Sequence, residues 1–379
     1  MKKILLLFIC VFLFPIRVFA LEMEVGAKSA ILIDQNTGTV LYSKNENERL
    51  PMASMTKVMS LLLIMEQINQ GNLSYDTKVE ISQEASSMGG SQIFLQAGDV
   101  YKVKELLKSV AMASANDSIV ALAEKTYGSK ENFINKMNEK AKKLNLQNTN
   151  FTNVHGLDED GHYSSAYDMA MMAKELLKYE DILKFTSVYE EYLQKNDGSK
   201  IWLVNTNKLV RFYPGVDGLK TGYTSNAGYC LTATAKRNSL RLISVVMGEE
   251  SIEKRSQDTV KLLNYGFNSY KVNLIKSKND ILGKVRVNNG KKENVDVVLV
   301  NDAIELLKAD EKVSKYEFKL KLDRIKAPVN KGDIIGKVEI YDDKNKLLNT
   351  ADITVNENVL KANLWDLFKR NLRNTFIFN

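Results

Sequence analysis

The stretch from Leu50 to Ile68, LPMASMTKVMSLLLIMEQI, constrains the fold more than any other part of the chain. As a helix it places apolar side chains on all sides, so the helix must be buried over most of its surface. Pro51 suits the start of a helix, because the first helical residues need no N–H donor. We therefore expect a buried central helix that begins near Ser54 and is covered by other elements.

Lys57 lies in the first turn of this predicted helix, three residues after Ser54. A charged amine is costly to bury, so two interpretations compete. In the plain one, Ser54 caps the helix and Lys57 extends its stem to reach water. In the other, the two side chains project from one face of the helix and act together, because residues three apart are neighbours on a helix surface.

Length and composition narrow the class of protein. The chain has 379 residues, 44% of them hydrophobic and 26% charged, which is typical of a folded protein and indicates more than one domain. The net charge is +7, and without the three basic residues of positions 1–20 it falls to +4 (50 − 46), which is mild. No Lys/Arg block with interleaved aromatic residues favours a nucleic-acid partner. The two histidines, His155 and His162, have no clustered cysteines or carboxylates around them, so we expect no metal and no cofactor.

The first twenty residues, MKKILLLFICVFLFPIRVFA, have the layout of a secretory signal peptide. Two lysines precede an apolar run, and a small residue, Ala20, stands where cleavage would follow. A retained membrane anchor is the alternative, but the run is shorter than the ~20 residues that a span needs. We expect residues 1–20 to be removed and the protein to be exported. Cleavage would leave Cys230 without a second cysteine, so we expect no internal disulfide.

Residues 21–271 combine helix and strand patterns and form the first predicted domain. Apolar runs at Ala30–Ile33 and Val40–Tyr42 flank turn residues and predict a hairpin. The helices and strands predicted after it are helices at Val103–Ala113, Ser118–Thr126, Ser129–Leu144 and Ala166–Lys178, strands at Gly228–Lys236 and Leu240–Met247, and a helix from Ile252 to Tyr265 that ends at Gly266.

The pattern changes to a period of two near Val272. Residues 272–357 contain several alternating runs, such as YEFKLKLDRI, and predict a small all-β domain. Residues 358–379 predict a terminal amphipathic helix, with leucines and Phe368 on one face and basic residues such as Lys369 and Arg370 largely opposite. We expect this helix to lie on an anionic membrane surface. Docking on the protein's own surface is the alternative.

Three short strings stand out in the first domain: Ser54-Met55-Thr56-Lys57, Ser114-Ala115-Asn116 and Lys220-Thr221-Gly222. Each is weak alone, since S-x-x-K recurs at Ser251–Lys254 and S-x-N recurs elsewhere. The evidence for a functional site is that the three strings occur together, in this order and in the following contexts. The first opens a buried helix, the second lies between two predicted helices, and the third begins a predicted strand.

The residue types in these strings suit acyl transfer. Serine is a poor nucleophile until a base takes its proton, and an amine can do so only when it is neutral. Burial, a second cation such as Lys220 and the positive helix N-terminus all lower the pKa of Lys57. We therefore expect Ser54 as nucleophile and Lys57 as general base.

The other two strings supply residues for proton transfer and substrate binding. Ser114 can relay a proton to the leaving amine, and Asn116 can bond to Lys57 and to a substrate amide. Lys220 and Thr221 can hold a carboxylate, while Gly222 lets a substrate backbone lie close to the strand. The backbone N–H groups of Ser54 and Tyr223 are the expected oxyanion hole.

With these strings, the chain resembles the low-molecular-mass penicillin-binding proteins, the serine-type D-alanyl-D-alanine carboxypeptidases. The stretches that carry the likeness are LPMASMTKVMSLLL, MASANDSIVALAE, NVHGLDEDGHYSSAYDMA and GVDGLKTGYTSNAGYCLTATA. The resemblance implies an α/β (α+β) catalytic domain of the penicillin-binding/β-lactamase type, with a helix cluster and an antiparallel sheet. It also implies the small β domain and the terminal helix.

The resemblance carries functional expectations with it. It implies a Ser54 acyl-enzyme, Lys57 as proton acceptor, Ser114 as second catalytic serine and Lys220 as substrate ligand. It also implies that Arg255 helps to hold the substrate carboxylate. The expected partners are peptidoglycan pentapeptides ending in D-Ala-D-Ala and, as inhibitors, β-lactams. The expected location is the outer face of the cytoplasmic membrane, on the cell-wall side.

Three alternatives use the same residues. A class A β-lactamase needs a glutamate in E-x-x-L-N, but Ala141 stands where it would precede Leu144-Asn145. A D,D-endopeptidase would use the same three strings on cross-linked peptides. A non-catalytic muropeptide sensor would have a degenerate site, which the intact strings disfavour.

Overall fold

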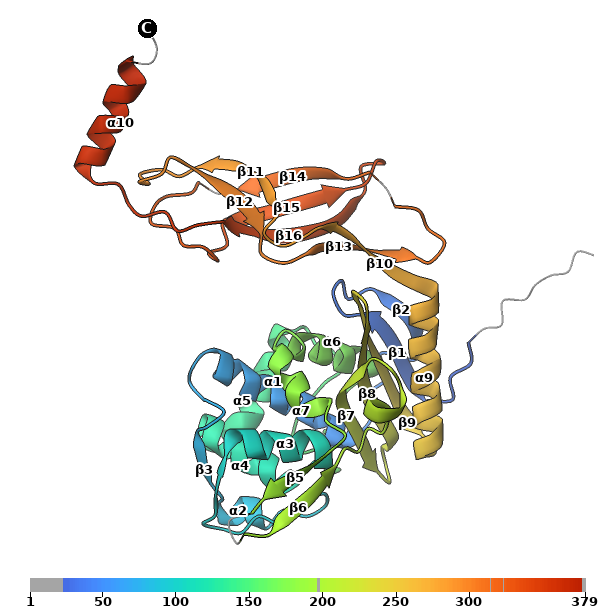
Figure 1. The fold of residues 1–379 in the computed structure, drawn as a ribbon. Helices are drawn as coiled ribbons and strands as arrows, with labels where there is room; N and C mark the ends of the chain where they lie inside the picture. The colour runs from blue at the N-terminus through green and yellow to red at the C-terminus, as the bar shows by residue number, and fades with distance from the viewer. Residues whose placement is uncertain (1–22, 196–197, 314, 323, 377–379) are drawn as a thin grey trace, which may run out of the picture.

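The computed structural model describes residues 23–195, 198–313, 315–322 and 324–376. The predicted signal peptide, residues 1–20, lies outside these residues. A five-stranded antiparallel sheet forms the centre of the first domain (Figure 1). Its strands, in spatial order, are β2 (Val40–Lys44), β1 (Ser29–Asp34), β9 (Leu240–Glu249), β8 (Gly228–Arg237) and β7 (Val216–Thr224). The hairpin predicted near the start of the chain is β1–β2, and β7 forms one edge of the sheet.

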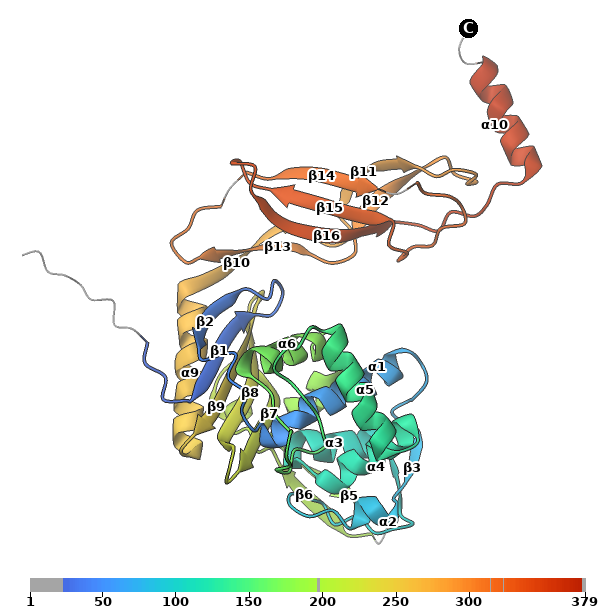
Figure 2. The same ribbon diagram turned by 180° about the vertical axis from the view of Figure 1, so that it is seen from behind.

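A cluster of helices covers one face of this sheet (Figures 1 and 2). Its main helices are α1 (Lys57–Asn69), α3 (Val103–Ala113), α4 (Asn116–Tyr127), α5 (Lys130–Lys143) and α6 (Ala166–Leu176). All residues of α1 from Lys57 to Met65 are buried, as the apolar stretch predicted. The shorter elements around the cluster are α2 (Gln83–Ser86), α7 (Leu183–Thr186), η2 (Glu180–Ile182), the β3–β4 pair (Lys78–Glu80, Val100–Lys102) and the β5–β6 pair (Glu190–Gln194, Lys200–Val204).

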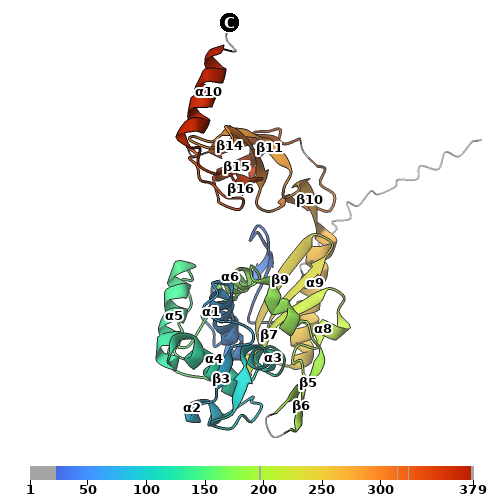
Figure 3. The same cartoon turned by 60° about the vertical axis from the view of Figure 1, so that its left-hand side comes forward.

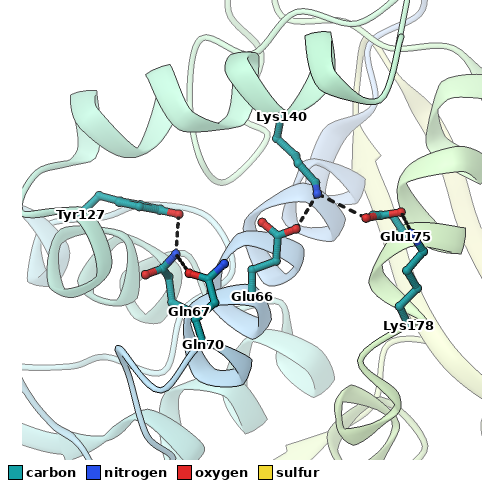
Figure 4. Close-up of polar contacts among 7 residues, drawn as sticks. All are labelled: Glu66, Gln67, Gln70, Tyr127, Lys140, Glu175 and Lys178. Carbon is teal, nitrogen blue, oxygen red and sulfur yellow. Dashed lines mark hydrogen bonds and ion pairs between the residues drawn. The ribbon is translucent and has the colours of Figure 1, made fainter. Parts of the chain in front are cut away.

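One ion-pair network links three helices of the cluster (Figure 4). Lys140 of α5 lies 2.5 Å from Glu66 of α1 and 3.3 Å from Glu175 of α6. All three side chains are less than one-fifth exposed. Lys178 pairs with the far oxygen of Glu175 at 2.6 Å. A single half-buried ammonium thus joins helices that are distant in the sequence.

The opposite face of the sheet is covered by α9 (Ile252–Ser269) and the short α8 (Leu209–Phe212). The prediction that this helix ends at Gly266 is wrong, because α9 continues to Ser269. Gly266 is needed inside the helix for close packing. A Cβ at this position would lie 2.5 Å from the side chain of Leu242 on β9, so the glycine lets the helix approach the sheet.

Strand β10 (Tyr270–Lys276) follows α9 directly and leads into the second domain (Figure 3). It pairs with β13 (Ala303–Lys308), and the remaining strands form a second five-stranded sheet. Their spatial order is β11 (Ile281–Arg286), β12 (Asn294–Leu299), β16 (Leu347–Val355), β15 (Gly336–Tyr341) and β14 (Glu317–Leu322). This domain has a hydrophobic core of its own, rich in valine and isoleucine.

The last described helix, α10, spans Leu364–Phe376 and is shorter than the predicted segment 358–379. Within the described residues, none of the helices is both long and apolar enough to cross a membrane. Leu364, Trp365 and Phe368 are at least half exposed on α10.

Candidate active site

Ser54 lies in a short 3-10 turn, η1 (Ala53–Thr56), and Lys57 is the first residue of α1. The serine therefore lies before the α-helix, whereas the sequence predicts that the helix begins near Ser54. A 3-10 turn has three residues per turn, so side chains three apart project in the same direction. Lys57 Nζ lies 2.9 Å from Ser54 Oγ.

Lys57 is fully buried and has two further partners. Its Nζ lies 2.7 Å from Asn116 Oδ1 and 2.7 Å from the backbone oxygen of His155. Burial, and next the positive charge of Lys220, hold the pKa of Lys57 well below its usual value, while Asp117 opposes this shift. A neutral amine has two N–H bonds, which fit the two carbonyl acceptors. Its lone pair is then left for the hydroxyl of Ser54.

The S-A-N string lies between α3 and α4, as predicted. Ser114 has a left-handed backbone (φ 62°) after α3, and Asn116 begins α4. The Oγ atom of Ser114 is buried and has no hydrogen-bond partner within the described part of the chain. Asn116 donates from Nδ2 to the backbone oxygen of Gly89 at 2.7 Å, which fixes its Oδ1 toward Lys57.

The K-T-G string lies in the second half of β7, not at its start. Lys220 is 1% exposed, and burial, followed by the charge of Arg255, lowers its pKa to about 7. Thr221 Oγ1 donates to Thr206 Oγ1 at 2.7 Å. Gly222 packs on η1, since a Cβ there would lie 2.7 Å from the backbone oxygen of Met52. The glycine thus brings the edge strand close to Ser54.

Arg255 lies on α9, yet its charge acts on Lys220. It is 5% exposed, and its Nε has no hydrogen-bond partner among the described residues. Burial lowers the pKa of this guanidinium. Lys220 and Arg255 are therefore two buried cations close to one another, and no carboxylate is among the causes that shift the pKa of Lys220. Such a pair is suited to bind an incoming anion.

Tyr223, whose backbone was predicted to join the oxyanion hole, follows Gly222 on β7. Its side chain is 56% exposed, and its ring stacks on that of Tyr229 with the centroids 4.3 Å apart. The backbone of Tyr223 therefore lies on the same strand as the K-T-G string, beyond the point where Gly222 meets η1.

Sequence reasoning missed the segment at His155 and Gly156. The carbonyl of His155 is one of the acceptors of Lys57, and Gly156 (φ 93°) lies against η1. A Cβ on Gly156 would fall 1.9 Å from the backbone oxygen of Ala53. The string NVHGL carries only the family likeness, and nothing in it indicates that a backbone carbonyl is the functional group.

Both histidines have structural partners. His162 Nε2 lies 2.8 Å from Thr56 Oγ1 in the 3-10 turn. Burial lowers the pKa of His155 to about 3 and that of His162 to about 4, so both are neutral at physiological pH. Among the described residues, no group of three or more histidine, cysteine, aspartate or glutamate side chains is arranged to hold a metal ion.

Comparison with known proteins agrees with this geometry. Residues 17–251 match the peptidase S11 family model, described as D-alanyl-D-alanine carboxypeptidase. Residues 270–361 match the penicillin-binding protein 5 C-terminal domain. The D-alanyl-D-alanine carboxypeptidase DacF of Bacillus subtilis is 48% identical over 353 residues, which cover 93% of this chain and 90% of that protein.

Solved structures give the same result. Penicillin-binding protein 5 from Haemophilus influenzae has a TM-score of 0.69 and 32% identity, and the match covers 89% of this chain and 98% of that one. Penicillin-binding protein D2 from Listeria monocytogenes in its ampicillin-bound form has a TM-score of 0.58 and 31% identity, with 65% and 99% covered. The chain therefore belongs to the peptidase S11 family of D-alanyl-D-alanine carboxypeptidases.

Proposed function

We propose that this protein is a serine D-alanyl-D-alanine carboxypeptidase that removes the terminal D-alanine from peptidoglycan pentapeptides. One observation carries the proposal beyond family membership: the buried amine of Lys57, whose pKa is held low, lies 2.9 Å from Ser54 Oγ with both of its N–H groups matched to carbonyl acceptors. This arrangement supports proton transfer from the serine to the lysine.

Acylation would begin when Lys57 Nζ takes the proton from Ser54 Oγ. The oxygen then attacks the carbonyl carbon of the penultimate D-alanine, and the negative oxygen that forms is held by the backbone N–H groups of Ser54 and Tyr223. When the intermediate collapses, the C–N bond breaks and the departing nitrogen receives a proton through the Ser114 hydroxyl. That hydroxyl is buried and has no other partner in the described residues, which suits a relay.

Deacylation requires a water molecule to attack the Ser54 ester. Lys57 can return to its neutral role and accept the proton of that water. No glutamate takes this role from the α5 end, because Ala141, the residue at the corresponding spacing, is packed in the core and 3% exposed. This observation disfavours a class A β-lactamase mechanism.

The substrate is bound by its terminal carboxylate. Lys220 and Arg255 are buried cations close enough for one to shift the pKa of the other, and Thr221 adds a hydroxyl at the same strand. A carboxylate placed there would relieve their mutual repulsion. Gly222 keeps β7 near η1, so a substrate strand beside β7 would present its scissile carbonyl to Ser54. β-Lactams carry a comparable carboxylate and would acylate the same serine.

The protein acts outside the cytoplasm, and we propose that it does so at the membrane surface. We assign residues 1–20 to a signal peptide, 21–271 to the catalytic domain, 272–357 to a β domain that serves as a spacer, and 358–379 to a membrane-surface anchor. Leu364, Trp365 and Phe368 are exposed on α10, and Lys369 lies 5.3 Å from the centroid of the Trp365 ring. Apolar and aromatic side chains beside a cation suit the interface of an anionic bilayer.

Fluorescent penicillin labelling and D-alanine release test the catalytic assignment. Wild-type protein should be labelled and should release D-alanine from a pentapeptide, whereas Ser54→Ala should do neither. Ser251→Ala is the matched control, in the chance S-x-x-K string at the N-cap of α9. It loses a helix cap but should be labelled and should release D-alanine like wild type. Labelling that persists in Ser54→Ala would refute the assignment. Binding to anionic vesicles with and without residues 358–379 tests the anchor separately.

A further inference from the structure

Two buried carboxyl groups outside the catalytic cleft have no part in the reaction above. Glu249 ends β9 and is 3% exposed, and Asp258 lies on α9 and is 1% exposed. The two side chains are within hydrogen-bonding reach of each other. Two adjacent buried carboxyl groups cannot both ionise without a large cost, so one shared proton is the stable arrangement.

The contacts decide which residue carries that proton. Asp258 accepts the backbone N–H of Gly26 at 2.5 Å and pairs with Lys261 at 2.8 Å. Although burial opposes them, these bonds lower the pKa of Asp258. Glu249 Oε1 is buried with no hydrogen-bond partner in the described residues, and burial, then Asp258, raises the pKa of Glu249 to about 7. Glu249 therefore carries the proton, and its O–H donates a hydrogen bond to the Asp258 carboxylate.

Charged groups face this pair from every neighbouring element. On α9, Lys261 pairs with Asp258, and the adjacent Glu250 raises the pKa of Glu249. The charged residues on the remaining sides are Lys44 of β2, which lowers the pKa of Glu249, and Glu24 of the N-terminal segment, whose charge acts on Lys261.

The pair joins the N-terminal segment to α9. Gly26 lies between Val25 and Ala27, both of which are buried in the core beneath α9. Lys44 donates to the backbone oxygen of Val25 at 2.6 Å, so the segment is held from both sides. Two bonds fasten it to the helix: the Gly26 N–H donates to Asp258, and Lys261 Nζ donates to the backbone oxygen of Glu24 at 3.3 Å.

Arg255 depends on where α9 lies. It is one helical turn before Asp258, on the same face, and its Nε has no partner of its own among the described residues. Glu249 also lies opposite Tyr229 in the sheet, and the Tyr229 ring stacks on Tyr223, the residue after the K-T-G string. The carboxyl pair is thus linked to Arg255 through α9 and to Tyr223, the residue after the K-T-G string, through Tyr229.

We propose that Glu249 and Asp258 are positioning residues, and that their shared proton fastens Val25–Ala27 to α9 and keeps Arg255 beside Lys220. This inference rests on the proposed function, because Arg255 matters there as a ligand of the substrate carboxylate. The fastened state binds the Glu249 proton more tightly than a loosened state would. The free energy that the Glu249 proton contributes to the fastened state is therefore fully present below a pH of about 4.5 and is lost as the pH rises to about 7.

Glu249→Gln tests the shared proton, since the amide keeps a donor toward Asp258 but cannot ionise. KM and kcat for a D-Ala-D-Ala peptide are measured from pH 5 to 8.5. The ratio of wild-type KM to Glu249→Gln KM should be near one at pH 5 and rise to roughly tenfold at pH 8, with little change in the kcat ratio. Glu250→Gln, at the exposed neighbour, is the matched control. It removes only the last of the causes that raise the pKa of Glu249, so its KM profile should keep the wild-type rise, displaced slightly to lower pH. Titration of Lys220 is common to all three proteins and cancels in the ratio.

Parallel KM profiles for wild type and Glu249→Gln, or a KM in Glu249→Gln raised equally at every pH, would overturn the proposal. Thermal unfolding over the same range is the second measurement. The wild-type Tm should fall relative to that of Glu249→Gln between pH 5 and 7, and equal slopes would also overturn the shared proton. A failure of the proposed function looks different, because wild type would then show no penicillin labelling of Ser54 at any pH.

Discussion

Gly156→Ala is the substitution whose effect on the active site follows most directly from the structure. The new Cβ would lie 1.9 Å from the backbone oxygen of Ala53, and the two segments must separate by at least about 1.5 Å to reach an ordinary contact of 3.4 Å. The left-handed backbone of Gly156 adds about 1–2 kcal/mol of strain for any residue with a Cβ. The separation moves the His155 carbonyl away from Lys57 or moves η1, which carries Ser54.

A misplacement of about 1 Å costs roughly 10²-fold in rate, or about 2.7 kcal/mol of transition-state stabilisation. We therefore expect the rate of acylation by a fluorescent penicillin to fall by roughly two orders of magnitude in Gly156→Ala.

Gly128→Ala is the matched control for backbone strain. Gly128 also has a left-handed backbone (φ 83°), but a Cβ there meets nothing within 4 Å. Urea unfolding should show a similar strain cost in both variants, with an additional steric loss in Gly156→Ala alone. An acylation rate of Gly156→Ala within twofold of that of Gly128→Ala would refute the reasoning, because the contact of Gly156 with η1 would then have no effect on the position of Ser54.

Three further predictions concern the lysines. Lys57→Met should lose at least 10³-fold in acylation, with a Tm that is unchanged or higher, because a buried amine is replaced by an apolar side chain; an unfolded variant would contradict this. KM for a peptide with a free C-terminal carboxylate should rise above pH 7, since Lys220, with a pKa of about 7, is charged mainly below that pH. An amidated peptide should lack this rise, and an equal rise in KM for both peptides would contradict the prediction. Lys140→Met should lower the free energy of unfolding in urea by about 2 kcal/mol, because it leaves Glu66 without its cation, while Glu175 keeps Lys178. Lys130→Met, which breaks the more exposed pair with Glu84, should cost at most about 1 kcal/mol, and equal losses would contradict the prediction.

Local patterns predicted the elements well where burial and periodicity agree. The apolar stretch after Pro51 became a buried helix, and the alternating runs after Val272 became strands. The pattern failed at Gly266, where the glycine predicts the end of a helix that continues to Ser269. There the deciding factor is contact with Leu242 on a different element, which has no local signal.

The candidate site divides in the same way. The three strings identify the residue types that meet at Ser54, and the structure brings Lys57 and Asn116 together with it. The backbone carbonyl of His155 could not have been predicted, because a carbonyl is present at every residue and only its position distinguishes it. The same holds for Glu249 and Asp258, which are ordinary surface residue types until folding buries them side by side.

The sequence by itself determined the chemistry that is available: a serine three residues from a lysine that an apolar helix must enclose, two partner strings and a separate β domain. The tertiary structure decided which charges face one another, because burial and distance set the pKa of Lys57, Lys220 and Glu249. Both quantities depend on how folding packs separate elements together, as it does with Lys57 on α1 and Lys220 on β7, so local sequence carries no measure of them.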